Sequence, residues 1–248
     1  MENITLTPQV MWRATTRYRP TSLAKTGLVA ESKAFLLAYE RLGDTSKAYA
    51  YLTDKGLPQR YRKSRQGIVD VLRARFTSWN PPTWVLDDLL EAARQDDPSF
   101  LQAMLLIHVA RQDPTIGDFV QRVVYQAWLR GESVVDRSVV NRFFDSVINE
   151  HPEVNKWTNS TRDKLASNIL TTLCNYGLLK AAHPRAAEKH IVEPVVPSLA
   201  VRHLVKLLRA EGVSWADIPG HSDWHLWLWD EQRVRRVLAA EGLEEDTL

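Results

Sequence analysis

The sequence predicts a mainly α-helical protein with two helix-turn-helix or winged-helix-like units and a small β-hairpin wing. Apolar residues recur at intervals of three and four along most of the chain, which is the period of an amphipathic helix. Glycine is scarce, at 10 of 248 residues, about 4% against the roughly 7% of average proteins, and this disfavours a turn-rich β-sandwich. Candidate N-caps and first-turn prolines precede several of the apolar runs.

The first 80 residues predict three helices. The first ends at Gly43, and Asp44 is a candidate N-cap for a short second helix that runs to Asp54. After a turn at Leu57, a third helix with a basic start begins near Ser64. Its apolar residues fall on one face; they are Ile68, Val71, Leu72 and Phe76.

The rest of the chain continues the helical pattern around one hairpin. Asp136 is a candidate cap for a helix that runs to about Glu150, and Thr158 or Asn159 caps a long helix that Gly177 ends. Residues 178–182 and 189–196 pair as a hairpin. The other helices are expected over residues 83–95, 98–112, 114–130, 197–210 and 230–241.

Charge alternates in blocks along the chain and divides it into three predicted domains. Residues 1–80, a helix-turn-helix-like unit, have a net charge of +8, and residues 81–155, a helical middle, have −6. Residues 156–248 hold a winged-helix-like unit and a Trp-rich tail; within them, 156–210 carry +6 and 211–248 carry −6. Basic blocks favour a polyanion, because each neutralised phosphate releases counterions. Acidic blocks instead favour a protein partner.

Several classes of protein are disfavoured. The single cysteine, Cys174, cannot form a disulfide within the chain. No apolar run is long enough to span a membrane, and together these observations predict a cytoplasmic protein. Motifs of P-loop, Ser-hydrolase and zinc-protease enzymes are missing, so we expect a non-enzyme without cofactor. His221, Asp223 and His225 could bind a metal, but aromatic packing of this Trp-rich stretch is the favoured interpretation.

The first candidate DNA-binding site is the basic end of the helix that begins near Ser64. A short helix, a tight turn and a second helix form the layout of a helix-turn-helix, whose second helix places its first residues in the major groove. Arginine suits both phosphates and guanine edges. The alternative is a merely solvated basic face. The candidate contacts are Arg60, Arg62, Lys63, Ser64, Arg65, Gln66 and Arg73.

The second candidate site is the long helix after Thr158 together with the hairpin. A polar-tipped helix followed by a basic hairpin is the recognition-helix-plus-wing arrangement of a winged helix. The alternative is again ordinary exposed charge. The helix contributes Asn159, Ser160, Thr161, Arg162, Lys164 and Asn168, and the wing contributes Lys180, Arg185 and Lys189.

Two segments resemble the BrxA family of BREX phage-defence systems, and the likeness extends over about residues 20–210. The first is LAKTGLVAESKAFLLAYERLGDTSKAYAYLTDKGLPQRYRKSRQGIVDVLRARF, and the second, WTNSTRDKLASNILTTLCNYGLL, is similar to the family's Ser-Thr-x-x-Lys helix that ends in Gly-Leu-Leu. The residues carried over are Arg62, Lys63, Ser64, Arg65, Ser160, Thr161, Arg162 and Lys164.

The resemblance implies a non-catalytic, double-stranded-DNA-binding component of an anti-phage operon. Other proteins of such operons include a DNA methyltransferase, an alkaline-phosphatase-like protein and an ATPase. Two alternatives stay open. The acidic surfaces could dock another BREX protein, making the chain an interaction scaffold, or the basic helix ends could bind structured RNA.

Overall fold

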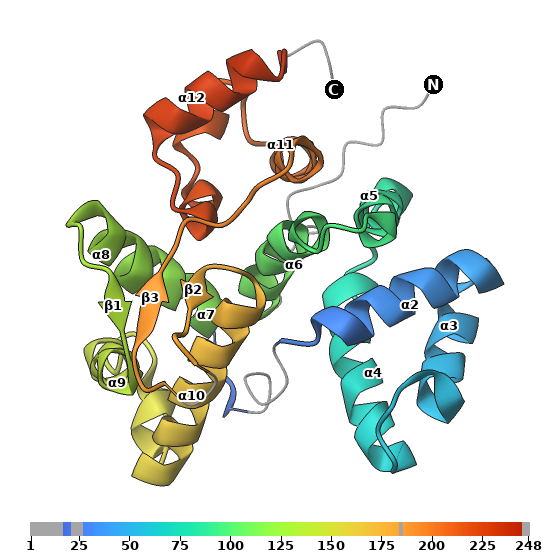
Figure 1. Cartoon of the computed structure of the whole chain (residues 1–248), viewed down its shortest axis with the longest axis horizontal. Coiled ribbons are helices and arrows are strands. Elements are labelled where there is room, and N and C mark those ends of the chain that lie inside the picture. The colour runs from blue at the N-terminus through green and yellow to red at the C-terminus, as the bar shows by residue number, and fades with distance from the viewer. Residues whose placement is uncertain (1–16, 21–26, 184–185, 245–248) are drawn as a thin grey trace.

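The protein is mainly helical with a small three-stranded antiparallel sheet, as the sequence predicts (Figure 1). The computed structural model describes residues 17–20, 27–183 and 186–244. In the described part of the chain, no helix combines the length and the apolar character needed to cross a bilayer.

The N-terminal helices are α2 (Val29–Leu42), α3 (Thr45–Tyr51) and α4 (Arg62–Phe76). Gly43 ends α2 in the left-handed region at φ 65°, which suits a residue without Cβ. Asp44 caps α3, as predicted, because its carboxylate accepts a 2.7 Å hydrogen bond from the Lys47 N–H. A π-helical segment, Leu52–Gly56, then carries the chain into the turn before α4.

Helix α4 does not start at Ser64, near which the sequence predicts its beginning. The helix begins at Arg62, two residues earlier, with Tyr61 at the cap position and no side-chain cap. The backbone explains the difference, since the N–H groups of Ser64 and Arg65 both donate to the Tyr61 carbonyl, at 3.0 and 3.2 Å. Ser64 therefore lies inside the first turn.

The middle of the chain supplies the central helix of the protein. This helix, α6 (Ser99–Gln112), is buried on nearly every side and contacts α2, α4, α5 and α11. Because it packs against helices from all three predicted domains, their cores are continuous. Its neighbours along the chain are α5 (Thr83–Arg94), α7 (Pro114–Phe119), a π-helical segment (Val120–Val124) and α8 (Tyr125–Leu129).

The second unit has the element order strand, helix, helix, strand, strand. The sheet order is β1-β3-β2, with Val134 opposite His190 and Leu179 opposite Ile191. The hairpin is confirmed, although its strands are shorter than predicted, and β1 was not predicted. The elements are β1 (Val134–Val135), α9 (Arg137–Ser146), a 3₁₀ segment (Pro152–Lys156), α10 (Asn159–Asn175), β2 (Leu179–Lys180) and β3 (Lys189–Ile191).

Local caps define the two helices of this unit. Asp136 caps α9, whose helix ends at Ser146 rather than near Glu150, and Thr158 caps α10 by accepting from the Thr161 N–H at 3.2 Å. Of the two predicted cap residues, Thr158 is the cap and Asn159 is the first residue of the helix.

The C-terminal segment packs its tryptophans inward. It comprises α11 (Ser198–Ala210), 3₁₀ segments Ile218–Gly220 and Ser222–Trp227, and α12 (Glu231–Ala240). Trp224 and Trp227 are fully buried. His225 stacks on Tyr125 with ring centres 3.9 Å apart, which agrees with the predicted aromatic packing of this stretch.

One buried guanidinium joins the C-terminal ends of α4 and α10. Arg75, at the end of α4, is fully buried and lies 3.4 Å from both the Tyr176 hydroxyl and the Ser32 hydroxyl. Tyr176 follows the last residue of α10 and donates to the Gly27 carbonyl. The two helices are thus anchored together at one end, and both extend from there toward the lower edge of Figure 1, where their N-termini lie.

Candidate nucleic-acid interface

The N-terminal end of α4 presents three cations that no carboxylate neutralises. Arg60, Arg62 and Lys63 are exposed, and none forms an ion pair with any residue that the structure describes. The Arg60 guanidinium lies 5.6 Å from the centre of the Tyr61 ring, and Tyr61 itself is 67% exposed. We call these four residues, Arg60 to Lys63, the α4 tip.

An open groove of about 1080 Å³ follows the α4 tip along the first two turns of the helix. Tyr61, Arg62 and Lys63 form its basic end, and Ser64 and Gln66 continue it; Asp70 closes the far end. The Gln66 amide donates to the Asp70 carboxylate at 2.7 Å. The groove therefore combines positive charge, one exposed aromatic ring and polar side chains.

Arg65 is not a surface contact, which corrects its predicted role. Its side chain donates to three backbone carbonyls, those of Thr53 at 2.8 Å, Gln59 at 2.7 Å and Arg60 at 3.1 Å. These bonds connect α4 to the end of the preceding π-helical segment. Arg65 consequently holds the turn that presents the α4 tip, and its donors are directed inward.

Arg73 is exposed, but it lies against α3 and beyond the tip. Its guanidinium is 4.9 Å from the centre of the Tyr49 ring. Burial raises the pKa of Tyr49 to about 12, so the ring stays neutral beneath the cation at physiological pH. Arg73 is thus partly engaged within the fold, two turns along the helix from Arg65.

The N-terminal end of α10 is less positive than its sequence predicts. Arg162 pairs with Asp145 at 2.6 Å and donates to the Val154 carbonyl at 3.3 Å, and only 15% of its side chain is exposed. Its predicted role as a free DNA contact is therefore wrong. Asp163 adds a second carboxylate, which accepts from Asn141 at 2.9 Å.

Four predicted residues remain accessible, fully or partly, on α10. Asn159, Ser160 and Lys164 are exposed, and Asn168 is half-buried. Thr161 lies in the capped first turn, where its hydroxyl is 2.9 Å from that of Thr158. We call Asn159, Ser160 and Lys164 the α10 tip, which carries one cation, the Lys164 ammonium group, because the Arg162 guanidinium is paired with Asp145.

The hairpin separates the three predicted wing residues. Lys180 on β2 is exposed, whereas Lys189 on β3 is only 9% exposed and donates to the Ala186 carbonyl at 2.5 Å. Lys189 therefore does not project from the hairpin as an exposed side chain, and its predicted contact with DNA stays a prediction. Arg185 falls outside the described residues.

Two accessible residues escaped the sequence analysis. Tyr61 lies between basic residues in QRYRKSR, and the sequence analysis considered only those basic residues. An aromatic residue between cations is itself a signal for stacking on nucleic-acid bases. Arg137, the first residue of α9, belongs to a block with negative net charge. The negative net charge of residues 81–155 therefore gave no indication that Arg137 is an exposed cation.

The fold defines a class: a mainly helical protein with a small three-stranded antiparallel sheet, in which the N-termini of α4 and α10 lie at the same edge (Figure 1). The model of the BrxA family matches residues 16–207, so the chain belongs to this family. Family membership supports a role associated with a BREX defence system.

A solved structure shares the fold. It is the crystal structure of an uncharacterized protein from Magnetospirillum magneticum, with a TM-score of 0.59 and 18% sequence identity, covering 80% of this chain and 100% of that one. No curated protein matches the sequence.

Proposed function

We propose that this protein is a non-catalytic component of a BREX system that binds double-stranded DNA through the α4 tip and the α10 tip. The observation that carries the proposal is the unneutralised charge of Arg60, Arg62 and Lys63. Arg122, by contrast, is exposed but paired with Glu150 at 2.7 Å. Free cations concentrated on one helix end favour a polyanionic partner.

The arrangement of the second unit supports a winged-helix mode for α10. A strand and a helix precede α10, and two antiparallel strands follow it, with the first strand pairing to the last. In a winged helix, the helix before the hairpin enters the major groove and the hairpin lies beside it. The first unit supports a helix-turn-helix mode, since α3 leads through a turn into α4.

The chemistry favours binding that tolerates many sequences. Contacts from Arg and Lys to phosphates fix register and orientation but carry no base information. The α4 tip offers three such cations, whereas Asn159, Ser160 and Gln66 are the neutral polar groups that can reach base edges. We therefore expect phosphate contacts to dominate the affinity.

Fluorescence anisotropy with a random-sequence duplex tests this function. The double variant Arg62→Glu/Lys63→Glu is expected to lose at least tenfold in affinity. Arg235→Glu/Arg236→Glu, which makes the same charge change on exposed positions of α12, is the matched control and should bind nearly as wild type. Equal losses in both variants, or no binding by wild type, would refute the proposal. Preference for an RNA of equal length over the duplex would instead favour the RNA-binding alternative.

An exposed apolar patch makes a protein-docking role the second candidate. Trp128, Leu129 and Val134 are 36%, 55% and 41% exposed and lie around the end of α8 and the edge strand β1. Such patches mark interaction sites, and an edge strand has backbone groups free to pair. A nuclease-resistant complex with another BREX protein that Trp128→Arg abolishes, in the absence of any DNA binding, would favour this scaffold function.

A further inference from the structure

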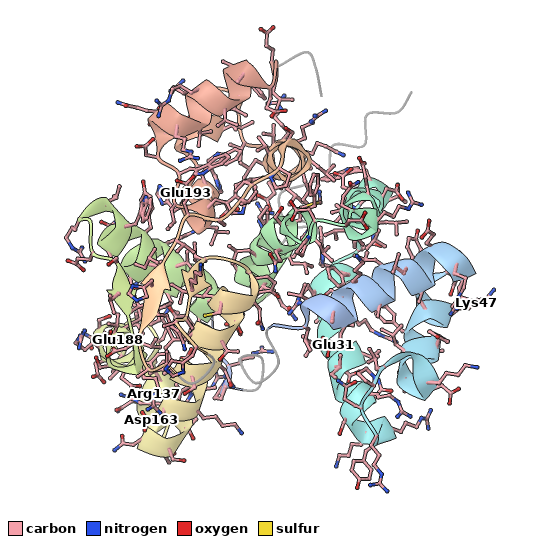
Figure 2. All side chains as sticks on the ribbon, viewed as in Figure 1. Glu31, Lys47, Arg137, Asp163, Glu188 and Glu193 are labelled. Carbon is pink, nitrogen blue, oxygen red and sulfur yellow. The ribbon has the colours of Figure 1, made fainter. Side chains whose placement is uncertain are left out.

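A polar pocket of about 220 Å³ lies between α10, the start of α9 and the hairpin. Arg137 of α9 and Lys189 of β3 supply two cations to its wall, and Ser167 and Thr171 supply two hydroxyls from α10. None of the described residues that line it is a carboxylate. Figure 2 shows the region at the lower left, where Arg137, Asp163 and Glu188 are labelled.

Lys189 is a buried residue, and its ammonium group pairs with no carboxylate among the described residues. Only 9% of the residue is exposed, and its one hydrogen bond goes to the Ala186 carbonyl; within the described ranges it meets no carboxylate. A buried charge is normally paired, because an uncompensated one loses hydration free energy. An anion in the pocket supplies the missing partner.

Arg137 adds a second unpaired cation on the same wall. Its exposed guanidinium forms no hydrogen bond or ion pair with a residue that the structure describes. The neighbouring Asp136 does not neutralise it, since the Asp136 carboxylate accepts from the Ser138 hydroxyl at 2.7 Å and the Val139 N–H at 3.0 Å. These bonds, the Ser138 hydroxyl first, lower the pKa of Asp136.

We propose that this pocket binds one phosphate group, with Lys189 and Arg137 as its two cationic contacts. The volume equals about seven water molecules, which is room for a phosphate and part of its hydration shell. The Ser167 and Thr171 hydroxyls donate to carbonyls one turn back in α10, at 2.9 and 2.8 Å, so their oxygens are left to accept from those waters.

Building on the proposed function, we assign the phosphate to the DNA backbone beside α10. Arg162 is tied to Asp145, so the pocket replaces the α10 end as the principal electrostatic contact of the second unit. Its two cations come from β3 and α9, so they hold the backbone on the hairpin side of the helix. A free phosphate ion has the same chemistry, and the experiment separates the two sources.

Two measurements on Arg137→Gln/Lys189→Met test the site. In the first, the dependence of log affinity for a random duplex on log salt is compared with wild type. Losing both cations removes the one neutralised phosphate, so the slope should fall by about 0.9, whereas Arg235→Gln/Arg236→Gln should leave it unchanged. In the second, inorganic phosphate is added at constant ionic strength and the melting temperature is followed. Phosphate should stabilise wild type and the control but not the double variant.

Each outcome decides the matter. An unchanged salt slope, with DNA binding intact, overturns the DNA assignment while the proposed function stands. Equal stabilisation of wild type and double variant by phosphate overturns the pocket itself. If inorganic phosphate stabilises wild type but not the double variant, and wild type binds no duplex, the pocket is a site for free phosphate. That result would refute the proposed function. Arg137→Gln alone guards against misfolding, since that side chain is exposed; it removes one of the two cations on that phosphate and should lower the slope by less than the double variant does.

Discussion

Replacing Arg65 separates a structural arginine from a DNA-contacting one within the same basic stretch. In Arg65→Gln, the three carbonyls of Thr53, Gln59 and Arg60 lose a charged donor. Each hydrogen bond to a charged group contributes about 1.5–3 kcal/mol when it is well formed, and less where water competes for the donor. Because Arg65 is half-buried, we expect the free energy of unfolding to fall by about 2 kcal/mol.

The expected shift is measurable by thermal unfolding. For a chain of this size, 1 kcal/mol corresponds to about 2–4 °C, so the melting temperature of Arg65→Gln should fall by about 4–8 °C. Duplex affinity should also fall, because the turn that presents the α4 tip is loosened. The slope of log affinity against log salt should stay at the wild-type value, since no phosphate contact is removed.

Arg62→Gln is the matched control, three residues away on the same helix. Its side chain is exposed and unpaired among the described residues, so stability should change by less than about 0.5 kcal/mol. The salt slope should fall by about 0.9. The reasoning is refuted if Arg65→Gln keeps the wild-type melting temperature and lowers the slope as Arg62→Gln does.

Two further predictions concern stability. Arg111 is buried between Asp223 at 2.7 Å and Glu211 at 2.5 Å, so Arg111→Met leaves two carboxylates without their cation and should lower the free energy of unfolding, measured by urea titration, by about 3–5 kcal/mol. Arg94→Met breaks an exposed ion pair and should change that free energy by less than about 1 kcal/mol. Similar losses in the two variants would contradict this prediction. Burial lowers the pKa of His108 and His203, whose Nε2 atoms are 2.9 Å apart. As pH falls, the unfolded state therefore binds protons on these histidines at a higher pH than the folded state does. The free energy of unfolding should fall as pH drops below about 6.5, by at most about 1.4 kcal/mol per pH unit for each histidine. A free energy of unfolding that stays constant from pH 7 to 5.5 would contradict this prediction.

The helices were predictable because their signals are local. Asp44, Asp136 and Thr158 cap helices through bonds to N–H groups three residues later, so the cap and its helix stand together in the sequence. The hairpin was predictable for the same reason. Strand β1 was not, since two residues show no alternation and its pairing partners are distant: Val134 pairs with His190, 56 positions away, and Val135 with Lys189, 54 positions away.

The candidate interface was less predictable because partners decide which cations are free. Asp145 neutralises Arg162 across 17 positions of sequence, and Thr53 engages Arg65 across 12. Neither pairing follows from charge order. The sequence placed the basic helix ends, whereas side-chain contacts decided which of their arginines face solvent. Arg137 shows the converse, a free cation within an acidic stretch.

The salt dependence of duplex binding before and after neutralising the α4 tip tests the DNA-binding proposal most directly. Wild type should bind a random duplex with a steep linear fall of log affinity with log salt. Arg60→Gln/Arg62→Gln/Lys63→Gln should lower that slope by about 2.7, one contribution of about 0.9 for each cation. A slope that the triple variant leaves at the wild-type value would contradict contact between the α4 tip and the DNA backbone.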